Sequence, residues 1–211
     1  MNAVRLLSTA RFYAILDTGY ASPERFGKLA SAVLAGGADI IQVRAKKSST
    51  AERIELLKAV APLCAEAGVP LVCNDDFEAA LAVPGVGLHI GQDDMPAREA
   101  RKLLGPERVL GLSTHSLAQA QGALALSDVL TYFAVGPVYK TGTKPDYQAV
   151  GLELVRAVAA LKPVLPWFCI GGLNLQNAAQ VRAAGAMALC AVSEVLLAEN
   201  PTAVVKSFCS E

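Results

Sequence analysis

The feature that most constrains the fold of this chain is an alternation, repeated eight times, of a short apolar run and a segment with helical spacing. Each apolar run ends in a polar or glycine residue, and strands that alternate with helices indicate a parallel sheet. The predicted strands cover residues 12–16, 40–44, 70–73, 87–90, 109–112, 132–135, 167–170 and 188–192. The predicted helices cover residues 23–35, 50–67, a short stretch ending at 82, 96–105, 117–126, 151–161, 174–184 and 201–208.

Eight such units in 211 residues predict a closed (β/α)₈ TIM barrel, a fold of the α/β class. No linker or low-complexity run divides the chain, so we expect a single domain over residues 1–211 with its barrel core at about 12–208. The alternative is a doubly wound sheet, which usually has a glycine-rich turn after its first strand. Here Asp17 and Thr18 follow that strand instead, which favours the barrel.

Charge and composition exclude several classes of protein. Lys and Arg number 19 and so do Asp and Glu, and this zero net charge argues against nucleic acid as a partner. The chain is 53% hydrophobic but contains no apolar stretch long enough for a transmembrane helix, so no membrane partner is expected. Five cysteines without a C-x-x-C pair predict neither disulfides nor a zinc site, and the expected location is cytoplasmic. A homo-oligomer remains an open alternative to a monomer.

Polar side chains gather where the predicted strands end. In a TIM barrel these ends converge on one mouth, where active sites form. A barrel with only structural loops would not need so many ionisable groups there. They are Gln42, Arg44, Lys46, Asn74, Asp75, Asp76, His89, Gln92, Asp93, Asp94, Ser113, His115, Thr141, Thr143 and Lys144.

Two of the acids are candidates for a metal site. Asp75 follows the third strand and Asp94 follows the fourth, so both can reach the same rim. Carboxylates with substrate phosphates and water suit Mg²⁺. The other reading of such acids is a helix cap or a loop acid, and we assign caps to Asp76 and Asp93.

The cations indicate a multiply charged anion as ligand. Arg44, Lys46 and Lys144 provide positive charge and Asn74 a neutral donor, which together with a divalent metal suits a diphosphate. Surface ion pairs are the other reading, but Arg44 alternates with Gln42 on one face of a strand. The loops after the seventh and eighth strands, with Gly171, Gly172, Val192 and Ser193, are placed where barrels often bind a second phosphate.

The sequence contains no convincing nucleophile. Ser113 and His115 lie two residues apart without the G-x-S-x-G turn of a hydrolase. We expect His89 to line the mouth or to make a buried hydrogen bond, and Ser113 to donate a hydrogen bond to a ligand. Phe133 and Tyr139 are interpreted as packing residues.

Six blocks of this sequence, taken together and in order, resemble the thiamine-phosphate synthase family. The resemblance spans about residues 13–195, and the combined spacing of the blocks is far more specific than any one of them. The blocks are 42–46 (QVRAK), 74–76 (NDD), 89–94 (HIGQDD), 111–115 (GLSTH), 136–139 (GPVY) with 141–144 (TGTK), and 170–173 (IGGL).

The resemblance implies a transferase that joins a hydroxymethylpyrimidine diphosphate to a thiazole phosphate and releases pyrophosphate. It implies a dissociative reaction in which the diphosphate leaves first and the thiazole nitrogen captures a pyrimidine cation. Catalysis is then expected from Arg44, Lys46, Ser113 and Lys144, with Mg²⁺ held by Asp75 and Asp94. Pyrimidine diphosphate contacts are expected from Gln42, Arg44, Lys46, Asn74, Ser113 and Lys144. Thiazole phosphate contacts are expected from Thr141, Thr143, Gly172, Val192 and Ser193. Val43, Ala45 and Gly142, which lie within the same motifs, are also expected to bind substrate.

The chain departs from the family pattern at three positions. Ala45 stands where Glu is frequent, Lys140 stands where a smaller or apolar residue is frequent, and Cys190 stands where Ser is frequent. Two alternatives to the synthase are a thiazole tautomerase on the same barrel and a non-catalytic protein that binds thiamine-pathway phosphates. Neither would require Asp75, Asp94 and Lys144 together, which favours the synthase.

Overall fold

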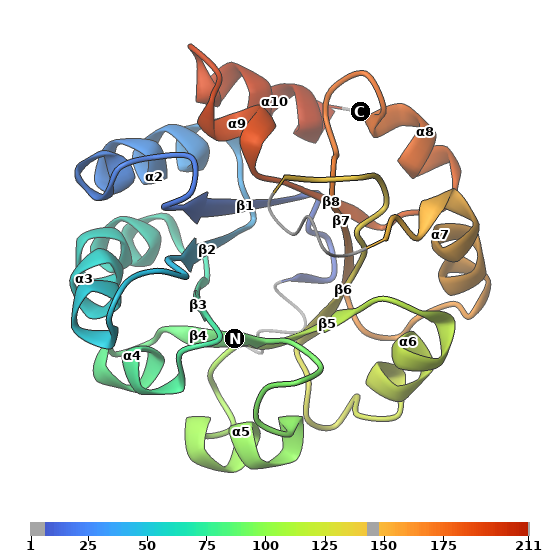
Figure 1. Cartoon of the computed structure of the whole chain (residues 1–211), viewed down its shortest axis with the longest axis horizontal. Coiled ribbons are helices and arrows are strands. Elements are labelled where there is room, and N and C mark those ends of the chain that lie inside the picture. Colours follow the sequence, from blue (N-terminus) through green and yellow to red (C-terminus); the bar gives the residue numbers. More distant parts are fainter. Residues whose placement is uncertain (1–6, 143–147, 211) are drawn as a thin grey trace.

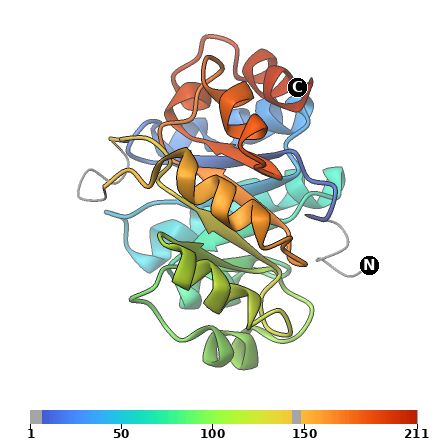
Figure 2. The same cartoon turned by 90° about the vertical axis from the view of Figure 1, so that its right-hand side faces the viewer.

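The computed structural model describes residues 7–142 and 148–210. Eight parallel strands close into a barrel in the order β1 to β8, with β8 paired to β1. Seen along its axis, the barrel is surrounded by helices (Figure 1), and the side view shows these helices packed along the outside of the strands (Figure 2). The predicted (β/α)₈ TIM barrel is confirmed.

The strands lie close to their predicted positions. They are β1 Phe12–Asp17, β2 Ile40–Arg44, β3 Leu71–Asn74, β4 Gly87–Ile90, β5 Leu110–Thr114, β6 Tyr132–Val135, β7 Trp167–Ile170 and β8 Ala188–Ala191.

The helices follow the strands as predicted, except that the predicted helix 23–35 is divided into η1 and α2, and that a short helix, α9, directly follows β8. They are η1 Pro23–Arg25, α2 Phe26–Gly36, α3 Thr50–Ala67, α4 Phe77–Ala82, α5 Ala97–Leu104, α6 Leu117–Leu124, α7 Gly151–Ala160, α8 Ala178–Ala183, α9 Ser193–Leu196 and α10 Pro201–Ser210. No helix within these described ranges is long and apolar enough to cross a membrane.

Local signals explain where the best-defined helix, α3, begins and ends. The Ser49 hydroxyl accepts from the backbone N–H of Glu52, and the Glu52 carboxylate accepts from the backbone N–H of Ser49, which is a capping box. At the other end Gly68 adopts φ 67°, a left-handed conformation that favours glycine. The helix therefore has the predicted bounds.

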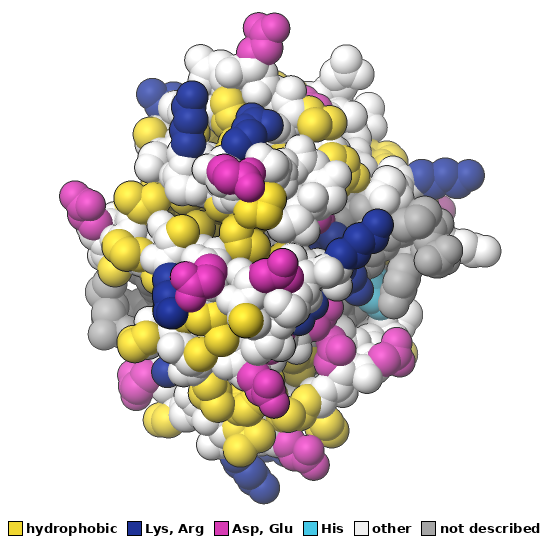
Figure 3. All heavy atoms as spheres, turned by 60° about the vertical axis from the view of Figure 1, so that its left-hand side comes forward, with side chains coloured by type: hydrophobic (Ala, Val, Ile, Leu, Met, Phe, Trp, Pro, Cys, Tyr) yellow, Lys and Arg dark blue, Asp and Glu magenta, His cyan; other side chains and the backbone are white. Residues whose placement is uncertain are grey.

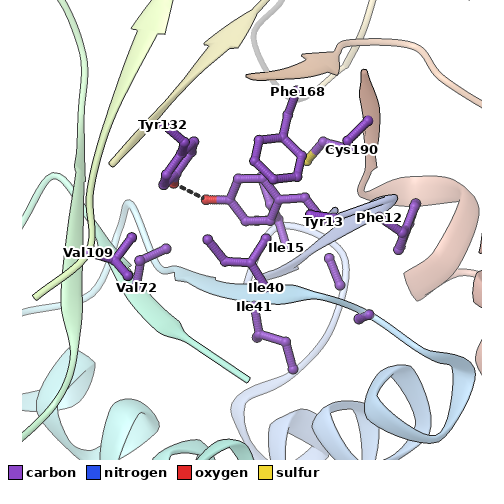
Figure 4. Packing of buried hydrophobic residues seen from close by; sticks show 14 of the residues in the cluster. Phe12, Tyr13, Ile15, Ile40, Ile41, Val72, Val109, Tyr132, Phe168 and Cys190 are labelled. Carbon is purple, nitrogen blue, oxygen red and sulfur yellow. Dashed lines mark hydrogen bonds between the residues drawn. The ribbon is translucent and has the colours of Figure 1, made fainter. Parts of the chain in front are cut away.

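Successive side chains of a strand point to opposite faces, so each strand contributes to two cores: the barrel interior and the layer between the strands and the helices. On β1, Tyr13 points into the barrel, whereas Phe12 points outward and stacks on Phe208 of α10 at 4.8 Å between ring centroids. Inside the barrel, Tyr13 meets Tyr132 and Phe168 edge to face, with centroids 5.6 and 5.2 Å away (Figure 4). These rings fill the barrel beneath its mouth.

Three local predictions were wrong. Asp93 does not cap α5: the N-cap position is Pro96, which makes no side-chain capping bond, and Asp93 is exposed. Asn174 does not begin α8, because its carboxamide oxygen accepts from Gln176 and Asn177 and closes a turn ahead of the helix. Asp17 does not stop the first strand but is its last residue, and it is buried.

Candidate active site

A cavity opens at the carboxyl ends of the strands, where the sequence predicts the site. The loop after β6 and the turns after β7 and β8 form one side of it, and residues of β1 to β5 form the other. The predicted site residues that line it are Gln42, Arg44, Asn74, Ser113, Thr141, Gly172, Val192 and Ser193. The barrel thus gathers residues of both predicted substrate sets around one cavity.

The floor of the cavity carries connected polar side chains. His89 lies 2.9 Å from the Ser113 hydroxyl through Nε2 and 2.8 Å from the Tyr132 hydroxyl through Nδ1. The Tyr132 hydroxyl is 2.8 Å from that of Tyr13, which accepts from Gln42 Nε2 at 2.5 Å. Burial raises the pKa of both tyrosines well above its ordinary value, so both are neutral phenols. His89 therefore both lines the mouth and makes buried hydrogen bonds, as predicted.

Arg44 enters the cavity from the end of β2 and is held there by an acid. Its guanidinium forms an ion pair with the Asp17 carboxylate, and the exposed fraction of the Asp17 residue is only 2%. The second Asp17 oxygen accepts from the backbone N–H of Gly19 at 2.8 Å. The register of β1 and β2 places Asp17 beside Arg44. Arg44 is therefore a fixed positive group rather than a mobile surface cation.

A second groove adjoins the cavity, and Asn74 lines both. Lys46, Ala45, Asp75 and Asp76 line this outer groove. The Asp75 carboxylate lies 3.7 Å from Lys46 Nζ, and Asp75 has φ 62°. The outer groove is thus where the structure places one predicted metal ligand and one predicted phosphate ligand.

Asp76 is committed to a structural role, as predicted. One carboxylate oxygen caps α4 by accepting from the backbone N–H of Ala79, and the other pairs with Arg53 at 2.7 Å and accepts from Thr50. Burial raises the pKa of Asp76, but the hydrogen bonds from Ala79, Arg53 and Thr50 outweigh that effect and hold it below its ordinary value. The adjacent Asp75 is left to face the groove.

Asp94 lies at the same rim. Its carboxylate accepts from the backbone N–H of Gly91 at 2.6 Å, and its side chain is exposed. Gly91 directly follows β4, and the backbone N–H of Asp75 donates to the carbonyl oxygen of His89 in that strand. The predicted metal ligands therefore lie in the loops that follow two neighbouring strands, Asp75 after β3 and Asp94 after β4. Among residues 7–142 and 148–210, no group of three or more Asp, Glu, His or Cys side chains is placed to hold a metal ion.

Two consecutive glycines shape the other side of the cavity. Gly171 and Gly172 have φ 103° and 64°, which favour glycine. A Cβ on Gly171 would lie 2.4 Å from Pro137, and one on Gly172 would lie 2.6 Å from the carbonyl oxygen of Lys140. The turn after β7 therefore packs directly against the loop after β6, which brings Gly172 and Thr141 to the same cavity.

Comparison with known proteins identifies nearly the same part of the chain as the resemblance found in its sequence. A model of the family described as thiamine monophosphate synthase matches residues 12–195. The chain belongs to that family. The match confirms the prediction made from the six sequence blocks.

Relatives are similar over nearly the full length of this thiamine monophosphate synthase family member. The thiamine-phosphate synthase of Streptomyces avermitilis is 41% identical over 96% of this chain and 93% of its own length. That of an Arthrobacter species is 42% identical over 98% of this chain and 96% of its own. The solved thiamine phosphate pyrophosphorylase of Pyrococcus furiosus has a TM-score of 0.85 at 29% identity, covering 97% of this chain and 96% of that one.

Four predicted substrate-binding residues of this family member are not among the described residues that line the cavity or the outer groove. Val43 is buried on the opposite face of β2 from Gln42 and Arg44, so its side chain packs in the core. Gly142 is exposed beside Thr141. Thr143 and Lys144 lie outside the described residues. Phe133 stacks on Trp167, with 6.2 Å between centroids, and Tyr139 packs against the core, as predicted.

Three residues at the cavity were not predicted as site residues: Asp17, Tyr13 and Tyr132. Tyr13 and Asp17 share the inward face of β1, four residues apart, which was a usable signal once β1 was placed in a barrel. The role of Tyr132 could not be predicted, because a tyrosine in an apolar run is normally interpreted as a packing residue. Of the three departures, Ala45 lines the outer groove, Lys140 is exposed, and Cys190 is buried beside Tyr13 and Phe168 at the cavity floor (Figure 4).

Proposed function

We propose that this family member joins a hydroxymethylpyrimidine diphosphate to a thiazole phosphate, giving thiamine phosphate and pyrophosphate. The observation that carries the proposal is the cavity itself: Gln42, Arg44, Asn74 and Ser113 on one side face Gly172 and its neighbours on the other. Such an arrangement suits two phosphorylated substrates that must meet in one place.

The proposed chemistry is dissociative substitution. The carbon–oxygen bond to the diphosphate breaks first, the diphosphate carries away the electron pair, and the thiazole nitrogen then forms the new bond to the pyrimidine cation. This route needs no protein nucleophile. The described cysteines support it, since burial raises the pKa of Cys73 to about 12 and raises that of Cys190 well above its ordinary value, which keeps both thiols protonated.

The protein's share of catalysis is electrostatic. Arg44, fixed by Asp17, and Lys46 in the outer groove would bind the departing diphosphate, and Ser113 would donate a hydrogen bond to it. Lys144 is proposed for the same role from its motif. Thr141, Thr143, Gly172, Val192 and Ser193 would hold the thiazole phosphate.

The acidic side chains at the rim of the cavity are ligands of the type that Mg²⁺ prefers. Asp75 and Asp94 are carboxylates on adjoining loops, and Mg²⁺ is commonly bound by one or two carboxylates, water and substrate phosphate oxygens. Asp75 and Asp94 would hold the ion, which when bound neutralises charge on the leaving diphosphate.

The direct test is to incubate the purified protein with both substrates and Mg²⁺ and to measure thiamine phosphate. Formation of thiamine phosphate and pyrophosphate in equal amounts is the expected result. Rearrangement of the thiazole phosphate alone would indicate the tautomerase instead, and binding of both phosphates without turnover would indicate a sensor.

Isosteric variants test the metal ligands. Asp75→Asn and Asp94→Asn each remove one charge, and Asp94→Asn leaves the turn intact because the new carboxamide oxygen can still accept from Gly91. We expect each to lower the Mg²⁺-dependent rate by roughly 100-fold. Asp93→Asn, at an exposed neighbouring acid, is the matched control and should keep the wild-type rate. Wild-type magnesium dependence in both Asp75→Asn and Asp94→Asn would overturn the assignment.

We also propose a cytoplasmic location, which the five buried, reduced cysteines support. The proposed partners are the two small-molecule substrates.

A further inference from the structure

A chain of hydrogen bonds crosses the barrel interior at the floor of the cavity and links side chains from five strands. In order it runs from Gln42 on β2 to Tyr13 on β1, Tyr132 on β6, His89 on β4 and Ser113 on β5. Its links measure 2.5, 2.8, 2.8 and 2.9 Å, and every member is buried. Ser113 ends the chain at the cavity surface, where its hydroxyl can meet a ligand.

The chain has a direction, which the Gln42 carboxamide sets. Gln42 Nε2 donates to the Tyr13 hydroxyl. Among the described contacts, the only acceptor for the Tyr13 proton is the Tyr132 hydroxyl, and the only acceptor left for the Tyr132 proton is then His89 Nδ1. The imidazole must therefore accept at Nδ1. A ring nitrogen that accepts a hydrogen bond carries no proton, so the imidazole proton lies on Nε2.

We infer that His89 is a positioning residue, held as its Nε2–H tautomer by Gln42, Tyr13 and Tyr132, and that it keeps the Ser113 hydroxyl pointing as a donor into the cavity. His89 Nε2–H donates to Ser113 Oγ, so the Ser113 proton is directed to a ligand acceptor. The opposite direction would make Ser113 donate to His89 and present lone pairs to the ligand.

This inference rests on the proposed function, because the group that accepts the Ser113 hydrogen bond is an oxygen of the diphosphate substrate. A donor suits the anion, whereas lone pairs would repel it. The orientation of the Gln42 carboxamide thus determines whether the Ser113 hydroxyl, four hydrogen bonds away, acts as a donor or as an acceptor toward the ligand.

The first experiment measures the tautomer directly. The ¹⁵N spectrum of ¹⁵N-histidine-labelled protein distinguishes a protonated from an unprotonated ring nitrogen, and His89→Gln identifies the His89 signals because the chain has only two histidines. We expect His89 to be protonated at Nε2 and bare at Nδ1. A proton on Nδ1, alone or together with Nε2, would overturn the inference.

The second experiment is a double-mutant cycle between Tyr132 and Ser113. Tyr132→Phe keeps the ring that packs on Tyr13 and Phe168 but removes the hydroxyl that donates to His89. We expect kcat/KM for the pyrimidine diphosphate to fall about tenfold, with KM for the thiazole phosphate unchanged. In a Ser113→Ala background the same change should cost less than about twofold, because the effect acts through Ser113. Equal losses in both backgrounds would show a merely structural role and would overturn the inference.

Thr131→Val is the matched control. The Thr131 hydroxyl is buried next to β6, accepts from the backbone N–H of Leu110 at 3.1 Å and takes no part in the chain. Its loss should lower the thermal midpoint and leave both kinetic constants unchanged. Failure of the proposed function would appear as an inactive wild type, whereas failure of this inference would appear in the tautomer or the cycle of an active enzyme.

Discussion

Arg44 and Asp17 form the most deeply buried ion pair among the described residues that reach the cavity. A buried charge is costly unless it is paired and hydrogen-bonded. Asp17 meets both needs, because one oxygen faces Arg44 and the other accepts from Gly19. The sequence predicted Arg44 but not its partner. The two lie 27 residues apart and meet only through strand register, which a single sequence does not reveal.

Asp17→Ala removes one side of this pair and should lower the free energy of unfolding by about 3–5 kcal/mol, because the charge of Arg44 then lacks its carboxylate. It should also raise KM for the diphosphate substrate, since Arg44 loses its fixed position. Urea denaturation and steady-state kinetics measure the two effects. Asp128→Ala, which breaks the exposed pair with Arg98, is the control and should change neither. An Asp17→Ala variant as stable as the wild type would contradict this account.

At the scale of elements, the helix caps show which acidic side chains stabilise the fold. Asp76→Ala removes the cap of α4 and the partner of Arg53, and we expect a loss of about 1–2 kcal/mol in unfolding free energy at neutral pH. Asp93→Ala should cost nothing measurable, because Asp93 is exposed and does not cap α5. Chemical denaturation of both variants tests the difference, and equal losses would refute it.

The Asp76 contribution should also depend on pH with a definite sign. The pKa of this carboxyl in the folded protein lies below its ordinary value of 3.8, so the charged form stabilises the fold. The advantage of wild type over Asp76→Ala should be complete above about pH 5 and shrink as the pH falls below 3.8. Denaturation curves from about pH 7 down to about pH 2 measure it. An advantage that grows on acidification would show the opposite sign.

The strands and most helices could be predicted because each has its own local signal, such as the Ser49 capping box or the apolar run of β7. The features that could not be predicted are either very short or depend on contacts between segments that are far apart in the sequence. The helix α9 has only four residues and follows β8 too closely to show any periodicity. The hydrogen-bond chain at the cavity floor joins five strands, so no window of sequence contains it.

At the scale of the whole molecule, the face that includes α2 and α3 shows Lys and Arg interspersed with Asp and Glu among hydrophobic side chains (Figure 3). The chain as a whole carries 19 cationic and 19 acidic side chains, and Arg44, Lys46, Asp75 and Asp94 are among the charged groups at the cavity and its rim.

Thiol reactivity should report unfolding of the whole barrel. Burial raises the pKa of Cys64 to about 12 and also raises that of Cys73, Cys169 and Cys190, so few thiolates exist at about pH 8. We expect the native protein to react slowly with a thiol reagent and to react fully across its denaturation transition. Cys209, in the last helix, should react first. Rapid labelling of Cys169 or Cys190 without denaturant would contradict this expectation.

The pairing of β8 with β1 joins the last strand of the barrel to the first. While the polypeptide is still being made, the β1 strand has no partner on that side until residues 188–191 have left the ribosome. A nascent chain that stops earlier would carry two open strand edges, which are sites for aggregation. The ring of this synthase can therefore close only after residues 188–191 have been synthesised, and until then the edge of β1 stays open.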